Sequence, residues 1–386
     1  MREDFGFTQD QIDIQLMTRD FIRKELTFER IKECDEKNEV PMDIVKKCAE
    51  MGLTSITLPE SIGGGGMGQV TNSLILEEIG YQDVGFATTI GACSLAYEPI
   101  SLFGTQEQKE LYGKYIVEGG LAAFALTEAD AGSDVSNART TAVKEGDEWV
   151  INGTKTYITN GANASIYTVF AVTNPGAGTR GMSCFIVERD RPGISVGKEE
   201  DKMGIRLSNT CEVIFDNVRV PADHLVGKEG QGFKIAMSTF DITRPAGVGA
   251  CCCGAMRSCI DKCLEYAATR ITFGQPILQN QAIQFMIADM EIRYEASRAL
   301  AYKVASAIDA GVIDSALASA SKTMSSDSLV KISEDAIQIF GGNGYSKEYP
   351  IEIIYRNAKI SQIFEGTNQV QRMVIIKSLL KASGMM

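Results

Sequence analysis

The stretch TTAVKEGDEWVI, residues 140–151, decides the fold of this 386-residue chain. Two runs suited to strands, 140–143 and 149–151, flank the turn signal Glu-Gly-Asp, a pattern typical of a β-hairpin. Further β-rich runs bounded by Gly, Pro and Asn lie outward from it, at 167–170, 183–187 and 211–215. We therefore predict an antiparallel β domain over residues 121–230.

Helical signals dominate before this domain. Thr8 with Gln11, and Thr105 with Gln108, have the spacing of capping boxes, and each pair precedes a periodic apolar pattern. Leu74, with the isoleucines that follow it, indicates a further helix between them. Residues 1–120 are therefore predicted to form an all-α domain.

Helical signals return after the β domain and continue to the end. Long Ala-, Met- and Leu-rich segments are separated by short glycine-containing breaks, a pattern that favours antiparallel neighbours. These segments are 233–268, 279–310, 315–340 and 367–382. We predict a C-terminal four-helix bundle over residues 231–386, and so an α+β chain.

Composition excludes several function classes. The formal net charge of −12 disfavours binding to nucleic acid, and no run approaches the ~20 apolar residues of a membrane helix. With no apolar signal segment at its start, the chain is expected to be cytoplasmic, with its ten cysteines reduced. The single histidine, His224, follows a strand and is expected to be solvated. Acid–base chemistry is therefore expected to depend on a carboxylate.

Three motifs are expected to be structural. The glycine-rich stretches 63–68 and 176–181 match a dinucleotide-binding pattern that requires a strand before it and a helix after it. The first joins apparent helices and the second lies between strands, so we expect plain loops. Residues 251–253 are three consecutive cysteines, whose side chains would diverge on a helix. We expect helix packing there and no metal site.

Two segments carry chemistry. Residues 124–135 run from a strand into a polar loop whose amides and hydroxyls suit a pyrophosphate or flavin edge, although an ordinary turn explains them equally well. Glu365 lies in an apolar stretch just before Gly366 and Thr367. Desolvation would raise its pKa and make it a useful base, whereas an interaction with a helix dipole is the plainer explanation.

Seven ordered segments decide between these readings, because together they resemble the acyl-CoA dehydrogenase family, with the short- and medium-chain members most similar. The segments, 126–134, 153–160, 232–237, 240–245, 270–274, 338–344 and 365–369, span nearly the whole chain in the family's order. The resemblance implies the family's α–β–α fold.

The resemblance also implies an activity. It implies a flavoprotein with bound FAD that converts an acyl-CoA thioester to the trans-2-enoyl-CoA and passes electrons to an electron-transferring flavoprotein. Glu365 resembles the base that removes the α-proton while the β-hydride passes to flavin N5. Its backbone N–H, with the flavin ribityl hydroxyl, would bind the thioester carbonyl oxygen, where charge develops. A homotetramer, less often a dimer, is implied as well.

The family's binding residues are carried over position by position, with several of the FAD contacts expected from the neighbouring subunit. Cofactor positions are Phe124, Leu126, Thr127, Gly132, Ser133, Tyr157, Ile158, Thr159, Arg270, Thr272, Gln281, Gln338, Gly341, Gly342, Thr367 and Gln369. Substrate positions are Ser133, Phe240, Asp241, Arg244, Glu365 and Gly366, although Arg244 could be purely structural. No metal is expected.

Departures from the family pattern narrow the substrate. Thr243 stands where some branched- and long-chain relatives carry the base, which favours Glu365. The stretch 85–94 lacks the arginine that holds a dicarboxylic acyl group in glutaryl-specific relatives. Small residues there, Ala87, Gly91 and Ala92, would leave a pocket floor that admits a medium chain, a branch or an alicyclic ring.

Alternatives share parts of this site. The same residues could serve an enoyl-CoA reductase, an acyl-CoA oxidase or an alicyclic-CoA dehydrogenase. A different class is a non-catalytic acyl-CoA-binding protein with the same fold, against which the retained Glu365 argues.

Overall fold

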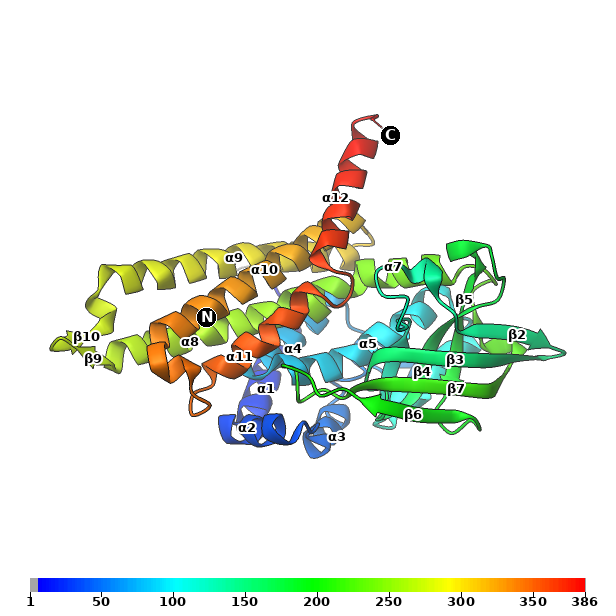
Figure 1. The fold of residues 1–386 in the computed structure, drawn as a ribbon, viewed down its shortest axis with the longest axis horizontal. Coiled ribbons are helices and arrows are strands. Elements are labelled where there is room, and N and C mark those ends of the chain that lie inside the picture. Colours follow the sequence, from blue (N-terminus) through cyan, green and yellow to red (C-terminus); the bar gives the residue numbers. More distant parts are fainter. Residues whose placement is uncertain (1–5, 386) are drawn as a thin grey trace.

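The computed structural model describes residues 6–385, in which helices, a sheet and further helices follow one another (Figure 1). The first helices are α1 (Gln9–Glu25), α2 (Phe28–Lys37), α3 (Met42–Glu50), α4 (Gln69–Gln82), α5 (Val84–Phe103) and α6 (Gln106–Val117). Both expected capping boxes are present. The Thr8 and Thr105 hydroxyls accept from the backbone amides of Gln11 and Gln108, and the side chains of these glutamines accept from the backbone amides of the two threonines. The glycine-rich stretch 63–68 is a loop that leads into α4, as expected.

One eight-stranded sheet forms the middle of the chain. Its strands are β1 (Leu121–Ala125), β2 (Thr141–Glu145), β3 (Glu148–Thr159), β4 (Ala164–Val172), β5 (Met182–Glu188), β6 (Ile194–Glu199), β7 (Thr210–Pro221) and β8 (Leu225–Val226). They lie in the order β6-β7-β3-β2-β4-β5-β8, with β1 beside β4. The predicted hairpin is β2–β3, with Thr141 opposite Asn152 and Glu145 opposite Glu148.

The sheet is not antiparallel throughout. β1 pairs with β4 in parallel, from Leu121 opposite Ala164 to Ala125 opposite Val169, and β2 touches β4 in parallel at one position. Sequence pattern indicates strands but not partners, and parallel neighbours need a long connection between them, here the β2–β3 hairpin. β1 thereby reaches the centre of the sheet, and the loop that follows it emerges beside the end of β3.

His224 is buried, contrary to the expectation of a solvated side chain. It is 7% exposed, and its Nδ1 lies 3.1 Å from the Ile186 carbonyl oxygen and 3.5 Å from Glu188 Oε2. The 3-10 turn Ala222–His224, between β7 and β8, folds the ring against β5. A loop position in the sequence therefore concealed a packing contact with a distant strand.

The C-terminal helices form an elongated body beside the sheet (Figure 1). They are α7 (Gly232–Arg244), α8 (Cys251–Thr269), α9 (Gln281–Asp309), α10 (Ser315–Phe340), α11 (Ile351–Ala358) and α12 (Asn368–Ala382), with the short hairpin β9 (Ile271–Thr272) and β10 (Gln275–Pro276) between α8 and α9. A π-helical turn, Pro245–Ala250, joins α7 to α8, because Pro245 has no amide for the regular ladder. Residues 251–253 open α8 and are buried cysteines.

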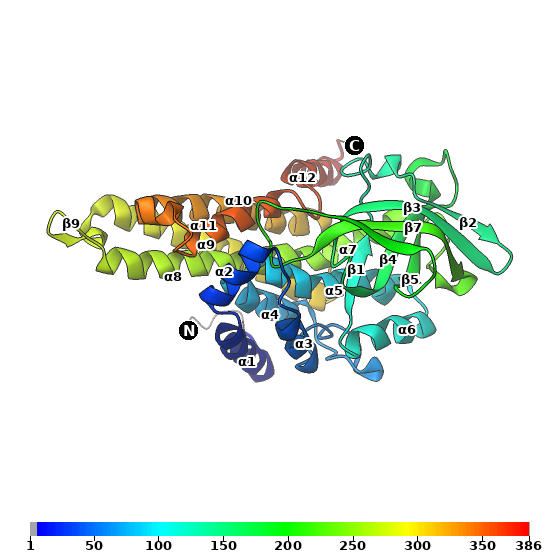
Figure 2. The same ribbon diagram turned by 60° about the horizontal axis from the view of Figure 1, so that its bottom comes forward.

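α4 and α8 cross with their backbones in close contact. A Cβ added at Gly254 would lie 1.9 Å from the Glu77 carbonyl oxygen, and one at Gly80 would lie 2.5 Å from that of Cys251. Only glycine permits this approach. α4 and α5 are thereby held against the C-terminal helices, while α1, α3 and α6 lie on the side away from α12 (Figure 2).

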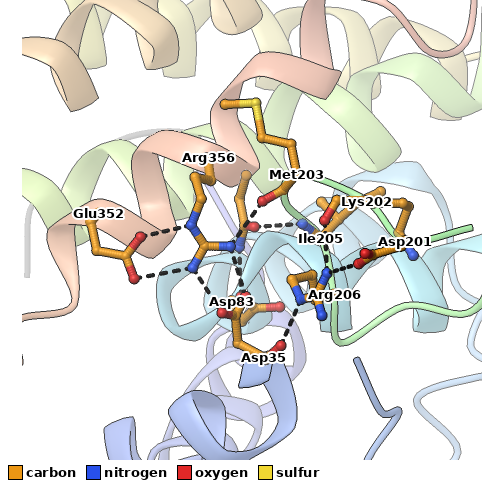
Figure 3. Close-up of polar contacts among 10 residues, drawn as sticks. Asp35, Asp83, Asp201, Lys202, Met203, Ile205, Arg206, Glu352 and Arg356 are labelled. Atoms are coloured by element: carbon orange, nitrogen blue, oxygen red, sulfur yellow. Dashed lines mark hydrogen bonds and ion pairs between the residues drawn. The ribbon is translucent and has the colours of Figure 1, made fainter. Parts of the chain in front are cut away.

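A polar network ties four segments together that are distant in sequence (Figure 3). Arg356 of α11 donates to both carboxylate oxygens of Asp35 in α2, at 3.0 and 2.8 Å. The next residue, Asn357, accepts from the Ile205 amide at 2.6 Å and donates to Asp83 at 2.7 Å. Asp83 caps α5, and burial raises its pKa to about 6. The link before β7 is thus fixed between the two helical regions.

Within residues 6–385, the helices all fall short of the length and apolar character that crossing a membrane requires.

Candidate active site

Glu365 lies in a sharp turn that precedes α12. Its φ is 52° and that of Gly366 is 88°, so two successive residues adopt the left-handed conformation, which is uncommon for glutamate. Thr367 caps α12 as expected, its hydroxyl accepting from the Val370 amide at 3.3 Å. The strained turn directs Glu365 to one side of the helix start.

Side chains from three helices hold this turn through its carbonyl groups, Arg244 and Gln371 together with Lys322 of α10, which donates to the Gly366 carbonyl oxygen. Arg244 of α7 donates twice to the Glu365 carbonyl oxygen, at 3.2 and 3.1 Å. Gln371 of α12 donates to the same oxygen at 3.2 Å and to the Gly366 carbonyl oxygen at 2.8 Å. No acceptor for the Glu365 amide occurs among residues 6–385, so this N–H remains available to a ligand.

The Glu365 carboxyl group is desolvated and unpartnered. Its Oε2 is inaccessible and has no hydrogen-bond partner within the described part of the chain, although the residue as a whole is half-buried. A Cβ added at Gly247, in the π-helical turn, would lie 3.1 Å from Oε1. Burial raises the pKa of Glu365, while the charges of Arg244 and Lys322 oppose that rise. A carboxylate in this setting is a proton acceptor.

Aromatic contacts connect the turn to the sheet. The rings of Phe124 at the end of β1 and Phe240 of α7 lie 5.4 Å apart, and the Arg244 guanidinium lies 5.1 Å from the centre of the Phe240 ring. Asp241 accepts from Arg244 at 3.2 Å. The structure therefore brings together the expected cofactor residue Phe124 and the expected substrate residues Phe240, Asp241 and Arg244, all near Glu365.

The loop after β1 is fastened to the end of β3. The Thr156 amide donates to the Thr127 carbonyl oxygen at 2.9 Å. Fully buried Lys155 donates to the Leu126 carbonyl oxygen at 3.0 Å and pairs with Glu128 at 2.7 Å. Two segments that are some thirty residues apart in sequence therefore form one edge.

This edge is open to a planar ligand. Tyr157 is 64% exposed with a φ of 56°, at an irregularity in the β3–β7 pairing, while Ile158 is buried and Thr159 is half-buried. Gly132 and Ser133 are exposed in the loop, and a Cβ at Gly132 would meet no atom within 4 Å. Exposed backbone, hydroxyls and an aromatic face are the groups that a flavin edge and a phosphate would use.

The remaining expected FAD positions form a second group at the far end of α8, α9 and α10 (Figure 1). Arg270 and Thr272 lie at β9, Gln281 begins α9, and Gln338 with Gly341 and Gly342 ends α10. Cβ atoms at either glycine would meet nothing within 4 Å, so a ligand could approach their backbone. Within one chain this group does not meet Glu365. Gln369, in the first turn of α12, is exposed.

The expected pocket floor lies on α5. Ala87 and Ala92 are buried, and Gly91 is half-buried, with Leu76 of α4 3.1 Å from a Cβ added there. A larger residue at 91 would therefore press on α4.

Sequence reasoning assigned no role to Lys155, Glu128, Gln371 or Lys322. Lys322 was detectable in principle, because it is a lone lysine in a stretch of a long helix, 318–326, in which every other residue except Met324 is small. Its partners were not, since they lie more than forty residues away.

Three sequence families match the chain and together cover most of it. They are the acyl-CoA dehydrogenase N-terminal domain (residues 8–142), middle domain (residues 123–218) and C-terminal domain (residues 230–380).

Individual relatives match along almost their whole length. The chain is 42% identical to the acryloyl-CoA reductase (NADH) of Anaerotignum propionicum, covering 98% of this chain and 97% of the relative. It is 41% identical to the solved butyryl-CoA dehydrogenase of Megasphaera elsdenii, with a TM-score of 0.95 and coverage of 98% and 100%. A chain from a structural study of the electron-transferring flavoprotein of Acidaminococcus fermentans is 43% identical, with a TM-score of 0.94 and coverage of 98% and 100%.

Proposed function

The chain belongs to the acyl-CoA dehydrogenase family, an oxidoreductase family, and we propose that Glu365 is its catalytic base in the α,β-dehydrogenation of an acyl-CoA thioester. The observation that carries this assignment is the inaccessible, unpartnered Oε2 of Glu365, in a turn that is held by its carbonyl groups and not by its carboxylate. A buried carboxylate without a partner is costly, and none of the hydrogen bonds that hold this turn uses the carboxylate.

The turn supplies two groups to the substrate. The Glu365 carboxylate accepts the proton from the α-carbon, and the unpaired Glu365 amide donates to the thioester carbonyl oxygen, on which negative charge develops. Arg244 and Gln371 hold the carbonyl of Glu365, and this fixes the direction of the turn. Both groups therefore reach the substrate without rearrangement.

FAD fits the residues around this turn. Thr127, Tyr157 and Thr159 would hold its ring system along the fastened edge of the sheet, and the exposed loop at Gly132 and Ser133 would contact its polar part or the substrate's. When bound, FAD supplies the acceptor for the β-hydride. Phe124, Leu126 and Ile158 give this edge an apolar lining, with Thr367 and Gln369 on the α12 side.

A homo-oligomer, which we propose is a tetramer, would complete the cofactor site. Arg270, Thr272, Gln281, Gln338, Gly341 and Gly342 lie together but away from Glu365 in the same chain. They would serve the FAD of a neighbouring subunit. Phe273 at the tip of the β9–β10 hairpin is wholly exposed, which supports burial against another copy.

We propose an electron-transferring flavoprotein as the electron acceptor and a short- to medium-chain, branched or alicyclic acyl group as the substrate. The first is supported by the similar chain in the Acidaminococcus study, and the second by the butyryl-CoA dehydrogenase and the small residues on α5. The relative named acryloyl-CoA reductase (NADH) favours one alternative, in which the same site reduces an enoyl-CoA.

Glu365→Gln tests the base. The variant should retain flavin and bind acyl-CoA, but anaerobic bleaching of the flavin by acyl-CoA should slow roughly a thousandfold, because an amide cannot accept the proton. Stopped-flow absorbance with butyryl-, octanoyl- and cyclohexanecarboxyl-CoA measures the rate and the acyl preference together.

Glu118→Gln, the same change at an exposed position, should bleach at the wild-type rate. Undiminished bleaching by Glu365→Gln would show that another group is the base. Reduction of the flavin by NADH followed by reoxidation with an enoyl-CoA, without turnover in the other direction, would favour the reductase alternative.

A further inference from the structure

Lys322 is a buried cation beside the Glu365 turn. It lies in the middle of α10, has no exposed surface, and has mostly small neighbours along its helix. Its Nζ donates to the Gly366 carbonyl oxygen at 3.0 Å and to Asn368 Oδ1 at 2.7 Å. It therefore reaches from α10 to both sides of Thr367.

Those two hydrogen bonds do not neutralise the charge. No described carboxylate lies within ion-pair distance of Lys322, and both of its acceptors are uncharged. Taking an ammonium group out of water without a counter-ion is costly. The Glu365 carboxylate is the charge that most favours the ammonium form, while burial lowers the pKa of Lys322 to about 8. The two buried groups thus stabilise each other's charged form.

The other titratable groups around Glu365 do not duplicate this effect. Arg244 from α7 is the second cation. From α8 come Cys251 and Cys252, whose pKa values burial raises, so both thiols are neutral. Asp327, farther along α10, is paired with Arg372. Among residues 6–385, Arg244 and Lys322 are therefore the two cations that favour the carboxylate form of Glu365.

The hydrogen-bonding role of Lys322 is shared, whereas its charge is not replaced. Gln371 also donates to the Gly366 carbonyl oxygen, and Arg244 holds the preceding carbonyl. Arg244 forms an ion pair with Asp241, which neutralises part of the Arg244 charge. Among residues 6–385, Arg244 thus has a carboxylate within ion-pair distance, whereas Lys322 has none.

We propose that Lys322 is a positioning residue for the base, whose buried ammonium group keeps the Glu365 carboxyl group in its proton-accepting form where no hydrogen bond can do so. The inference rests on the proposed role of Glu365 as the base. The charge interaction between the two side chains can be measured independently of that role.

The test is the ionisation of Glu365 in charge-changing variants. Lys322→Gln keeps a donor but removes the charge, Lys322→Met removes both, and Lys322→Arg keeps the charge. Infrared difference spectra over a pH series report the Glu365 carboxyl group, with its band identified by its loss in the same variant carrying Glu365→Gln. The acidic limb of kcat/KM for acyl-CoA is measured in parallel.

Lys322→Gln should raise the pKa of Glu365 by about one unit, because a nearby opposite charge favours ionisation by this order. The acidic limb should move by the same amount, and kcat/KM should recover above the new pKa. Lys322→Arg should leave the Glu365 band near its wild-type pH. Lys262→Met changes a half-buried lysine of α8 that lies over the Tyr81 ring and should shift neither readout.

An unchanged Glu365 titration in Lys322→Gln, or a loss of kcat/KM that is equal at every pH, would overturn the proposal and leave Lys322 a structural residue. If Lys322→Gln does not fold, Lys322→Met decides by the same criteria. Should wild-type protein turn over no acyl-CoA, the proposed function fails, while the infrared titration still decides whether Lys322 controls Glu365.

Discussion

Single buried carboxyl groups in this protein differ in what surrounds them. Glu128 is paired with Lys155, which lowers the pKa of Glu128 against the opposing effect of burial. Glu365 has no partner for Oε2 but faces two cations. Glu98, on α5, is 7% exposed and has neither a hydrogen bond nor an ion pair in the described chain. Its burial alone raises the pKa of Glu98 to about 7.

Glu98→Gln should therefore stabilise the protein in a pH-dependent way. A raised pKa means that the folded wild-type protein binds this proton more tightly than the unfolded chain does, so the wild-type protein loses stability as pH rises from the unfolded pKa of about 4.5 through 7, whereas the variant does not. Relative to wild type, the variant should gain about 3 kcal/mol in free energy of unfolding between pH 5 and pH 9. Denaturant titration at both pH values measures it, with exposed Glu118→Gln as control. An equal difference at the two pH values would contradict the prediction.

At the scale of helices and strands, the sequence predicted what is local. Both capping boxes, the β2–β3 hairpin and the cap at Thr367 depend on residues within a few positions of each other, and all are present. The parallel β1–β4 pairing and the burial of His224 depend on partners about forty residues away, which no local pattern encodes.

The same limit applies to the candidate site. Glu365 stood out because an acidic residue in an apolar stretch is unusual, and the family resemblance supplied its role. Lys322 and Lys155 are distant in sequence from the groups that they contact. These contacts therefore form only when the helices and the sheet have assembled. The family resemblance identifies the positions that are expected to contact the ligand. The residues that support those positions can be identified only in the folded structure.

The α4–α8 crossing gives a prediction at this scale. Gly254→Ala should lower the free energy of unfolding by about 1–3 kcal/mol, because its methyl group would collide with the Glu77 carbonyl and the helices would separate. Ala268→Gly, at an exposed position of α8, should cost at most about 1 kcal/mol. Urea denaturation compares the two, and a Gly254→Ala variant as stable as wild type would mean that the crossing can widen freely.

At the scale of the whole molecule, two parts of the described chain expose apolar side chains, the β9–β10 hairpin and α12. α12 projects away from the body, with only its first turn packed against α10 (Figure 1). Met373, Ile376 and Leu379 are 68, 51 and 58% exposed. Apolar side chains on a projecting helix are typical of a subunit contact.

Replacing Met373, Ile376 and Leu379 with serine should weaken the proposed oligomer. Sedimentation velocity should show smaller species at concentrations where wild type remains assembled, because the apolar area that drives association is lost. Lys377→Ser with Lys381→Ser changes polar positions of the same helix and should leave the assembly intact. An unchanged sedimentation coefficient in the triple variant would place the contact elsewhere.

The separation of Glu365 from the cluster at Arg270 and Gln338 has a genetic consequence. If each cofactor binds between two copies, a Glu365→Gln chain still supplies an intact cluster at Arg270 and Gln338. An Arg270→Ala chain still supplies an intact Glu365 turn. When two variants that are each inactive alone are co-expressed, every mixed pair of chains would therefore contain one complete active site. Such a locus would show complementation between alleles of a single gene.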